Sequence, residues 1–137
     1  MSITRAQTAK RLLNSIAPKG EKLAYINDKE INVSSLSLKN ESTLVTGIPA
    51  KTDYSDDEFN QLISTFQSWK KIRMIGSAAM AAVYVAAGKA ERYQEKGTFL
   101  WDVAAGASIV SAAGGKVSIS NLQADFRVDV MFSNNQI

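Results

Sequence analysis

Apolar and polar positions repeat with two different periods along the chain, and the two periods predict different elements. Apolar side chains fall at helical spacing after Ser55 and Glu58, which are spaced as in a capping box, so a helix is predicted from residue 55 to about residue 69. Short runs rich in β-branched and aromatic residues predict strands, and a turn at Asn27–Asp28 joins the first two runs. These runs cover residues 22–28, 29–35, 42–49, 71–75, 91–95, 115–120 and 126–133.

Further helices are predicted where small or apolar residues recur outside these strands. Ser77 can cap an alanine-rich helix that stops at Gly88. Asp102 is expected to open another helix, which ends before residues 114–115, and residues 4–16 carry an amphipathic helical pattern. Helices and strands alternate through the second half of the chain, which indicates an α/β layered domain.

The composition narrows the chemistry that this chain can perform. Its 137 residues include no cysteine and no histidine. A thiolate zinc site, a cysteine nucleophile and a histidine base are therefore excluded. Any metal ion must be held by oxygen atoms, which suits magnesium, calcium or manganese.

The charge pattern argues against a nucleic-acid partner. The net charge is only +3, and the densest basic cluster is Lys70, Lys71 and Arg73, without interleaved aromatic residues. The longest apolar run, residues 74–88, is too short to span a bilayer, and the first residues lack the apolar centre of a signal peptide. We therefore expect no nucleic acid, no membrane partner and a cytoplasmic location.

The strongest candidates for chemistry lie at joints between strands and helices. Asp102 stands where a helix begins, and it is either an ordinary N-cap or a metal carboxylate. Glu95 ends a predicted strand seven residues earlier, so the two side chains can face one crevice, although an exposed glutamate explains the position equally well. Gly76 and Ser77 offer an anion site at the next helix start, unless that helix is simply a close-packed core helix.

Other acidic residues have simpler explanations. Asp56, Asp57 and Glu58 are interpreted as first-turn charges of their helix rather than as a metal cluster. Asp125 and Asp129 flank and enter the last predicted strand, and both are expected to face solvent.

Several of these segments together resemble the inositol monophosphatase family. The run "WDVAAGASIVSAAGG" is similar to that family's C-terminal signature, and "IRMIGSAAMAAVYVAAGKAERYQEKG" resembles the stretch before it. The hairpin "AYINDKEINVS" and the closing strand "FRVDVMFSNNQI" also resemble family segments, with Asp28 where the family usually has glycine. The resemblance runs from about Gly20 to Ile137.

The resemblance implies specific roles. It implies that Asp102 is a ligand of Mg²⁺, that Glu95 contacts substrate hydroxyl groups, and that Gly76, Ser77 and Ala78 line the substrate pocket. It also implies Mg²⁺-dependent hydrolysis of phosphate monoesters of polyols or sugars, a reaction that needs no histidine or cysteine.

The chain departs from the family in its first part. The family's D-P-x-D-G-T metal loop is absent, because the only prolines are Pro18 and Pro49 and neither follows an aspartate. We therefore expect an unmatched helical segment at residues 1–19 and a domain at residues 20–137 that resembles the C-terminal half of the family.

Two functions follow as alternatives from this departure. One is a partial phosphatase that is nearly inactive alone, because most of its metal ligands are missing. The other is a non-catalytic module that binds a phosphorylated small molecule or a protein. In either case, we expect a homodimer or a partner that supplies the missing half.

Overall fold

A computed structural model describes residues 23–48 and 53–137, and its centre is a 5-stranded mixed sheet in the order β4-β3-β5-β7-β6. Its strands are β3 (Thr43–Thr46), β4 (Lys71–Met74), β5 (Arg92–Phe99), β6 (Lys116–Ser120) and β7 (Arg127–Ser133). A separate hairpin pairs β1 (Ala24–Ile26) with β2 (Lys29–Ile31). The helices are α2 (Asp56–Gln67), α3 (Ala78–Ala86) and α4 (Leu100–Ala112), with a 3-10 turn, η1 (Lys39–Glu41).

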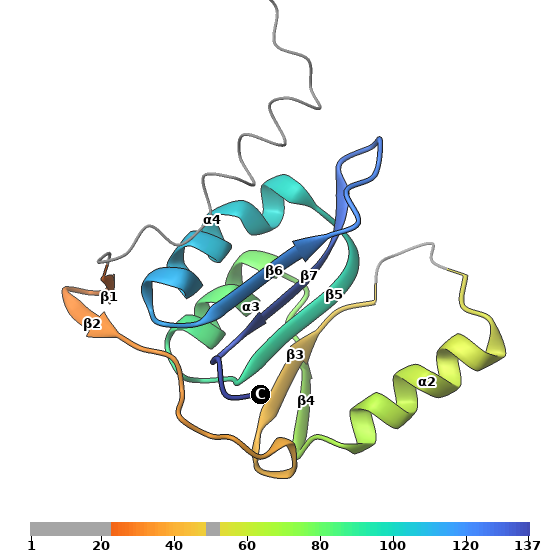
Figure 1. Cartoon of the computed structure of the whole chain (residues 1–137), viewed down its shortest axis with the longest axis horizontal. Helices are drawn as coiled ribbons and strands as arrows, with labels where there is room; N and C mark the ends of the chain where they lie inside the picture. The colour runs from red at the N-terminus through yellow and green to blue at the C-terminus, as the bar shows by residue number, and fades with distance from the viewer. Residues whose placement is uncertain (1–22, 49–52) are drawn as a thin grey trace, which may run out of the picture.

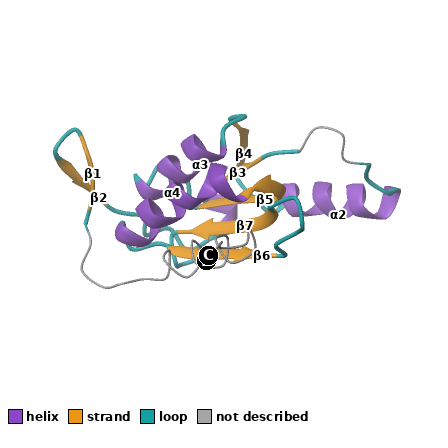
Figure 2. Cartoon of the chain, turned by 90° about the horizontal axis from the view of Figure 1, so that it is seen from above, coloured by secondary structure: helices purple, strands orange, loops and turns teal. Residues whose placement is uncertain are grey.

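The sheet is parallel on one side and antiparallel on the other. Strand β3 runs parallel to both β4 and β5, whereas β7 runs antiparallel to β5 and to β6. Helices α3 and α4 lie side by side on one face of this sheet, and α2 lies beside the sheet rather than on that face (Figures 1 and 2). The predicted α/β layered domain is confirmed.

Small residues let α3 and α4 approach each other closely. A Cβ atom added at Gly106 of α4 would lie 2.4 Å from the Cβ of Ala82 on α3, which is far inside contact distance. The inner face of α3 is buried through Ala81, Ala82, Val85 and Ala86. The small side chains of these helices therefore serve close packing against each other and against the sheet.

Strand β5 carries a bulge that changes which residues face the helices. Glu95 pairs with Val130 and Thr98 pairs with Val128, so β5 has one more residue than β7 across this interval. Side chains alternate between the two faces of a strand, and the extra residue brings Thr98 onto the face shared by Tyr93 and Glu95.

Asp129 of β7 holds this bulge. Its Oδ1 accepts a hydrogen bond of 3.0 Å from the backbone N–H of Gly97, and its Oδ2 accepts one of 3.1 Å from Asn121 Nδ2. Asp129 is half-buried and lies between the core residues Val128 and Val130, so its side chain is on the sheet face away from α3 and α4, where these two donors engage it. Asp125, in contrast, is exposed as expected and pairs with Arg127 at 3.1 Å.

Most local predictions agree with the structure. Ser55 and Glu58 form the predicted capping box. Asn27 and Asp28 form the hairpin turn in left-handed conformations, with φ angles of 49° and 61°. Ser77 caps α3 by accepting a hydrogen bond from the backbone N–H of Met80.

Some predicted boundaries were wrong. Helix α4 begins at Leu100 with Phe99 as its N-cap, so Asp102 lies within the first turn and does not open the helix. The reason is that β5 continues to Phe99 and leads directly into α4, whereas the predicted strand ended at residue 95.

Two predictions fall on residues that the structure does not describe. The helix at residues 4–16 lies outside the described ranges, and the domain boundary near residue 19 stays a prediction.

Among residues 23–48 and 53–137, no helix is long and apolar enough to cross a membrane. The cytoplasmic location stays a prediction.

Candidate functional site

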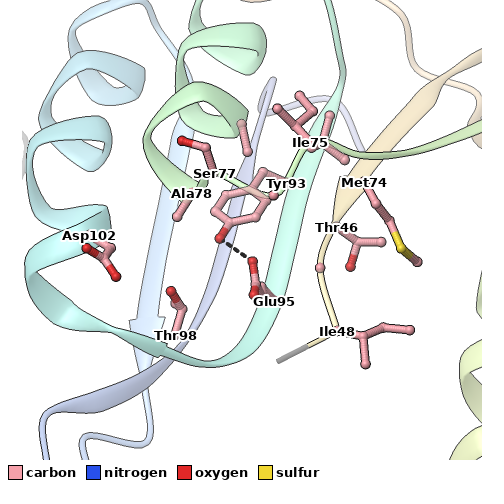
Figure 3. Close-up of a pocket in the computed structure, with 14 residues that line it drawn as sticks. Thr46, Ile48, Met74, Ile75, Ser77, Ala78, Tyr93, Glu95, Thr98 and Asp102 are labelled. Carbon is pink, nitrogen blue, oxygen red and sulfur yellow. Dashed lines mark hydrogen bonds between the residues drawn. The ribbon is translucent and has the colours of Figure 1, made fainter. Parts of the chain in front are cut away.

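A pocket of about 500 Å³ lies where the parallel strands β3, β4 and β5 meet the starts of α3 and α4 (Figure 3). This is the crevice where open α/β sheets usually bind ligands, because the carboxyl ends of parallel strands share one edge. All of the site residues predicted from the sequence line it together. The complete lining is Val45, Thr46, Gly47, Ile48, Met74, Ile75, Gly76, Ser77, Ala78, Ala81, Tyr93, Glu95, Thr98 and Asp102.

The carboxylate of Glu95 is fixed between two neighbours. The Tyr93 hydroxyl donates a hydrogen bond of 2.7 Å to Glu95 Oε2. A Cβ atom added at Gly47 of the β3 end would lie 2.7 Å from the Cδ and from both oxygens of Glu95. A glycine is therefore needed at position 47 for the carboxylate to occupy this place.

Tyr93 is a donor that stays protonated. Burial raises the pKa of its hydroxyl well above the ordinary value of 10.0, and the hydrogen bond to Glu95 and the negative charge of Glu95 raise this pKa further. Tyr93 itself is buried against the Phe132 ring at a centroid distance of 5.7 Å. Its hydroxyl therefore remains a fixed donor to Glu95 throughout the neutral pH range.

Asp102 approaches the pocket from another element. It lies in the exposed first turn of α4, where the positive end of the helix dipole favours a carboxylate. Figure 3 shows Asp102 on α4 and Thr98 and Glu95 on β5, around the same space. The structure brings Asp102 and Glu95 into one crevice, as the sequence predicts, and their chemical roles stay predictions.

The start of α3 forms the third wall. Ser77 Oγ accepts a hydrogen bond of 3.2 Å from Met80 N, so the first turn of α3 is ordered at the pocket. No atom lies within 4 Å of the place where a Cβ of Gly76 would stand, so the backbone before α3 is open to a ligand. An open helix start favours an anionic group.

Several lining residues were not predicted from the sequence. Tyr93 could have been found, because it stands two positions before Glu95 and therefore shares its strand face. Gly47 carries a weak signal as a glycine at a predicted strand end. Thr98 carries none, because only the bulge in β5 places it in the pocket.

The oxygen atoms at the pocket are of the kind that Mg²⁺ prefers as ligands, but they are too few to complete its coordination. Magnesium prefers octahedral oxygen coordination, and the carboxylates that line the pocket belong to Asp102 and Glu95. Within the described ranges, no group of three or more His, Cys, Asp or Glu residues could hold a metal ion. The described residues therefore supply part of an oxygen site and do not complete one.

The fold and the pocket define an α/β protein that matches solved structures of inositol monophosphatase type. The inositol monophosphatase of Anabaena superposes with a TM-score of 0.70 at 32% identity, over 81% of this chain and 45% of that one. The inositol monophosphatase of Thermotoga maritima superposes with a TM-score of 0.69 at 31% identity, over 87% of this chain and 45% of that one.

The sequence comparison identifies the family. The model of the inositol monophosphatase family matches residues 8–134, and the chain belongs to this family. An inositol-1-monophosphatase of Synechocystis is 40% identical over 99 residues, which are 69% of this chain and 33% of the relative. The Nus factor SuhB of Pasteurella multocida is 39% identical over 95 residues, which are 69% of this chain and 36% of the relative. The match therefore spans about a third of the length of these relatives.

Proposed function

We propose that the pocket binds the phosphate monoester of a polyol or sugar, and that this chain contributes the substrate side of a magnesium-dependent phosphatase site. One observation carries the proposal: Gly76, Ser77, Ala78, Glu95 and Asp102 converge on a single pocket at the carboxyl ends of the parallel strands. Membership of the inositol monophosphatase family supports the same reaction class.

Each wall of the pocket has a role in this proposal. The open backbone at Gly76 and the start of α3 receive the phosphate group, because free N–H groups and the helix dipole favour negative charge. Glu95 accepts hydrogen bonds from ligand hydroxyl groups through its free oxygen, since Tyr93 occupies only Oε2. Asp102 supplies one oxygen ligand for Mg²⁺. Magnesium, when bound, lowers the pKa of water and neutralises charge on phosphate oxygens.

The isolated chain is nearly inactive in this proposal. Phosphoryl transfer depends on positioning and on charge stabilisation, which require a metal ion held by several ligands. Asp102 alone would bind Mg²⁺ weakly, because this ion gives up its water ligands reluctantly. Activity would then need further carboxylates from another part of the polypeptide or from a partner.

The alternative is a non-catalytic module that binds a phosphorylated ligand or a protein. It is favoured by the small number of carboxylates at the pocket, since the binding of a phosphate by a helix start needs no metal ion. In this case Gly76 and Ser77 matter for binding, and Asp102 does not.

Calorimetry on the wild-type chain and on Asp102→Asn separates the two functions. If Mg²⁺ binds tightly and this binding is lost in Asp102→Asn, further ligands complete the site and turnover should be assayed with inositol phosphate. If inorganic phosphate binds equally well to both proteins without Mg²⁺, the non-catalytic module is supported. Enzyme-like turnover by the purified chain would contradict the proposed inactivity.

We also propose that the chain associates through α2 and the neighbouring edge strand β4, either with a second copy or with a partner that supplies the missing half. Phe59 and Ile63 on α2 are 50% and 39% exposed, and Met74 at the end of β4 is 53% exposed. An amphipathic helix normally buries its apolar face, so the exposed apolar side chains of α2 indicate a surface that another molecule covers. Sedimentation at increasing concentration tests this proposal, and a stable monomer at high concentration would contradict self-association.

A further inference from the structure

A second polar cluster surrounds Trp69, at the opposite end of the parallel strands from the pocket. Trp69 follows α2 and precedes β4, and it is only 6% exposed. The Nζ of Lys39, from η1, lies 5.7 Å from the centre of its ring. The Cζ of Arg92, at the start of β5, lies 5.4 Å from the same centre. Two cationic side chains therefore meet at one buried aromatic ring.

The cluster contains hydrogen-bond donors without acceptors. Trp69 Nε1 and Arg92 Nε are both buried, and neither has a hydrogen-bond partner among the described residues. Buried donors are almost always paired in folded proteins, because an unpaired one loses its bonds to water without compensation. These two atoms indicate that an acceptor is missing from this place.

The adjacent carboxylate does not pair with either donor in the structure. Glu91 precedes Arg92 and is buried, and its Oε2 accepts the backbone N–H of Thr43 at 2.6 Å, but neither Trp69 Nε1 nor Arg92 Nε bonds to it. Within the described part of the chain, the one ion pair joins Arg127 and Asp125 and does not involve Arg92. Burial lowers the pKa of Arg92, since the charged guanidinium is partly removed from water without a countercharge.

We infer that Lys39, Trp69 and Arg92 form a binding site for an oxyanion, separate from the candidate active-site pocket. An oxyanion would supply acceptor atoms to the Trp69 and Arg92 donors and negative charge to both cations. A water molecule could satisfy the N–H groups, but it would bring no negative charge to the two cations. The ligand that fits this site therefore carries a phosphate or a carboxylate group.

The two sites lie on different parts of the sheet. Arg92 and Tyr93 are consecutive in β5, so their side chains point to opposite faces of the sheet. Tyr93 faces the pocket, whereas Arg92 faces away from α3 and α4 toward Trp69. A ligand at Trp69 therefore does not compete directly with one at Glu95 and Asp102.

Tryptophan fluorescence can report on this site directly. The chain has two tryptophans, so Trp101→Phe leaves Trp69 as the single tryptophan, whose emission can be excited apart from that of the tyrosines. Inorganic phosphate is titrated at constant ionic strength, in this variant and in one that also carries Glu95→Gln and Asp102→Asn. We expect a saturable change in Trp69 emission with the same midpoint in both proteins. This comparison separates the second site from the pocket, because failure of the proposed function would leave the signal intact.

Charge-removing variants test the named residues. Arg92→Gln should weaken phosphate binding about tenfold, the loss typical of a charge-assisted hydrogen bond, and Lys39→Gln should weaken it less. Arg73→Gln is the matched control, since Arg73 is exposed on β4 and its Nη1 bonds only the carbonyl oxygen of Ile72. Its midpoint should equal that of the parent protein.

Two outcomes would overturn the inference. One is a signal that does not saturate at constant ionic strength, and the other is a midpoint that Arg92→Gln and Arg73→Gln change equally. If Arg92→Gln does not fold, Arg92→Lys keeps the charge and should retain measurable but weaker binding. Acetate titrated in place of phosphate distinguishes the source: tighter binding of acetate would indicate an acidic side chain, and tighter binding of phosphate a phosphorylated small molecule.

Discussion

The Tyr93 hydroxyl donates a hydrogen bond of 2.7 Å to the Oε2 of Glu95, two positions further along the same strand. A Cβ atom added at Gly47 would lie 2.7 Å from the same carboxylate, so a glycine at this position leaves the room that Glu95 occupies. A carboxylate held in this way presents its remaining oxygen to the pocket in one orientation, without the entropy cost of ordering a free side chain when a ligand binds.

The ionisation of Tyr93 should make the stability of the protein depend on alkaline pH. Its pKa in the folded protein is raised above the ordinary value of 10.0, so its contribution to stability is fully present below pH 10.0 and is lost as the pH rises further. Tyr93→Phe removes the donor to Glu95 and should lower the free energy of unfolding by about 1–2 kcal/mol at neutral pH. Urea denaturation of both proteins between pH 7 and pH 11 tests this prediction. The difference between their free energies of unfolding should shrink above about pH 10. A difference that grows there would contradict the raised pKa of Tyr93.

Gly47→Ala should displace Glu95 while the protein still folds. The new Cβ would stand 2.7 Å from the Glu95 carboxylate, which lies at the end of a flexible side chain and can move away. We expect a small loss of stability, a broken Tyr93–Glu95 hydrogen bond and weaker binding of a polyol phosphate. A crystal structure of the variant and calorimetry would measure both effects.

The control for this variant is the double substitution with Glu95→Ala. If the Cβ acts only through the Glu95 carboxylate, Gly47→Ala should have almost no further effect in the Glu95→Ala protein. Equal effects in both backgrounds would show that the alanine disturbs the end of β3 itself.

Gly106→Ala should destabilise the packing of α3 against α4. Alanine normally favours a helix over glycine by about 1 kcal/mol, but here its Cβ would lie 2.4 Å from the Cβ of Ala82. Overpacking of this kind costs about 1–3 kcal/mol, so the free energy of unfolding should fall. Thermal and urea denaturation would measure it. Adding Ala82→Gly should recover part of the loss, and a Gly106→Ala protein that is more stable than the parent would contradict the close approach.

The capping box of α2 should weaken in acid. Hydrogen bonds from the backbone N–H and the hydroxyl of Ser55 hold the pKa of Glu58 below its ordinary value of 4.5. The stabilisation is therefore present above pH 4.5 and is lost as the pH falls through the lower pKa of the folded state. Because α2 has no buried residue, its first turn should open locally rather than with the whole domain.

Amide hydrogen exchange measures this opening. In Ser55→Ala, the amides of Glu58 and Phe59 should exchange about fivefold faster near neutral pH, as expected for a lost N-cap. The exchange of the core strand β5 should stay unchanged. Equal acceleration in both regions would mean that α2 unfolds only together with the domain.

The sequence predicted those features that depend on neighbouring residues. The capping box at Ser55 and Glu58, the turn at Asn27 and Asp28 and the cap at Ser77 each involve hydrogen bonds or backbone angles within a few positions. Such local interactions leave a visible pattern of residue types at fixed spacing.

The site could be predicted in part for a similar reason. Gly76 lies between β4 and α3, Asp102 lies in the first turn of α4, and Glu95 lies within β5 beside the end of β3, so all three reach the edge where the parallel strands end. The resemblance to the inositol monophosphatase family pointed to the same residues, and family membership is confirmed by the match over residues 8–134.

The sequence by itself determined the order of the helices and strands and the membership of the inositol monophosphatase family. It also showed that α3 and α4 are rich in the small residues that let the two helices pack closely. The tertiary structure alone decided that Thr98 enters the pocket, that Gly47 and Tyr93 fix Glu95, and that α4 begins at Leu100. These features could not be predicted from the sequence because they depend on contacts between residues that are far apart along the chain. The bulge in β5 depends on a hydrogen bond between Gly97 and Asp129, which are 32 residues apart, and a single extra residue in a strand reverses the facing of every side chain after it.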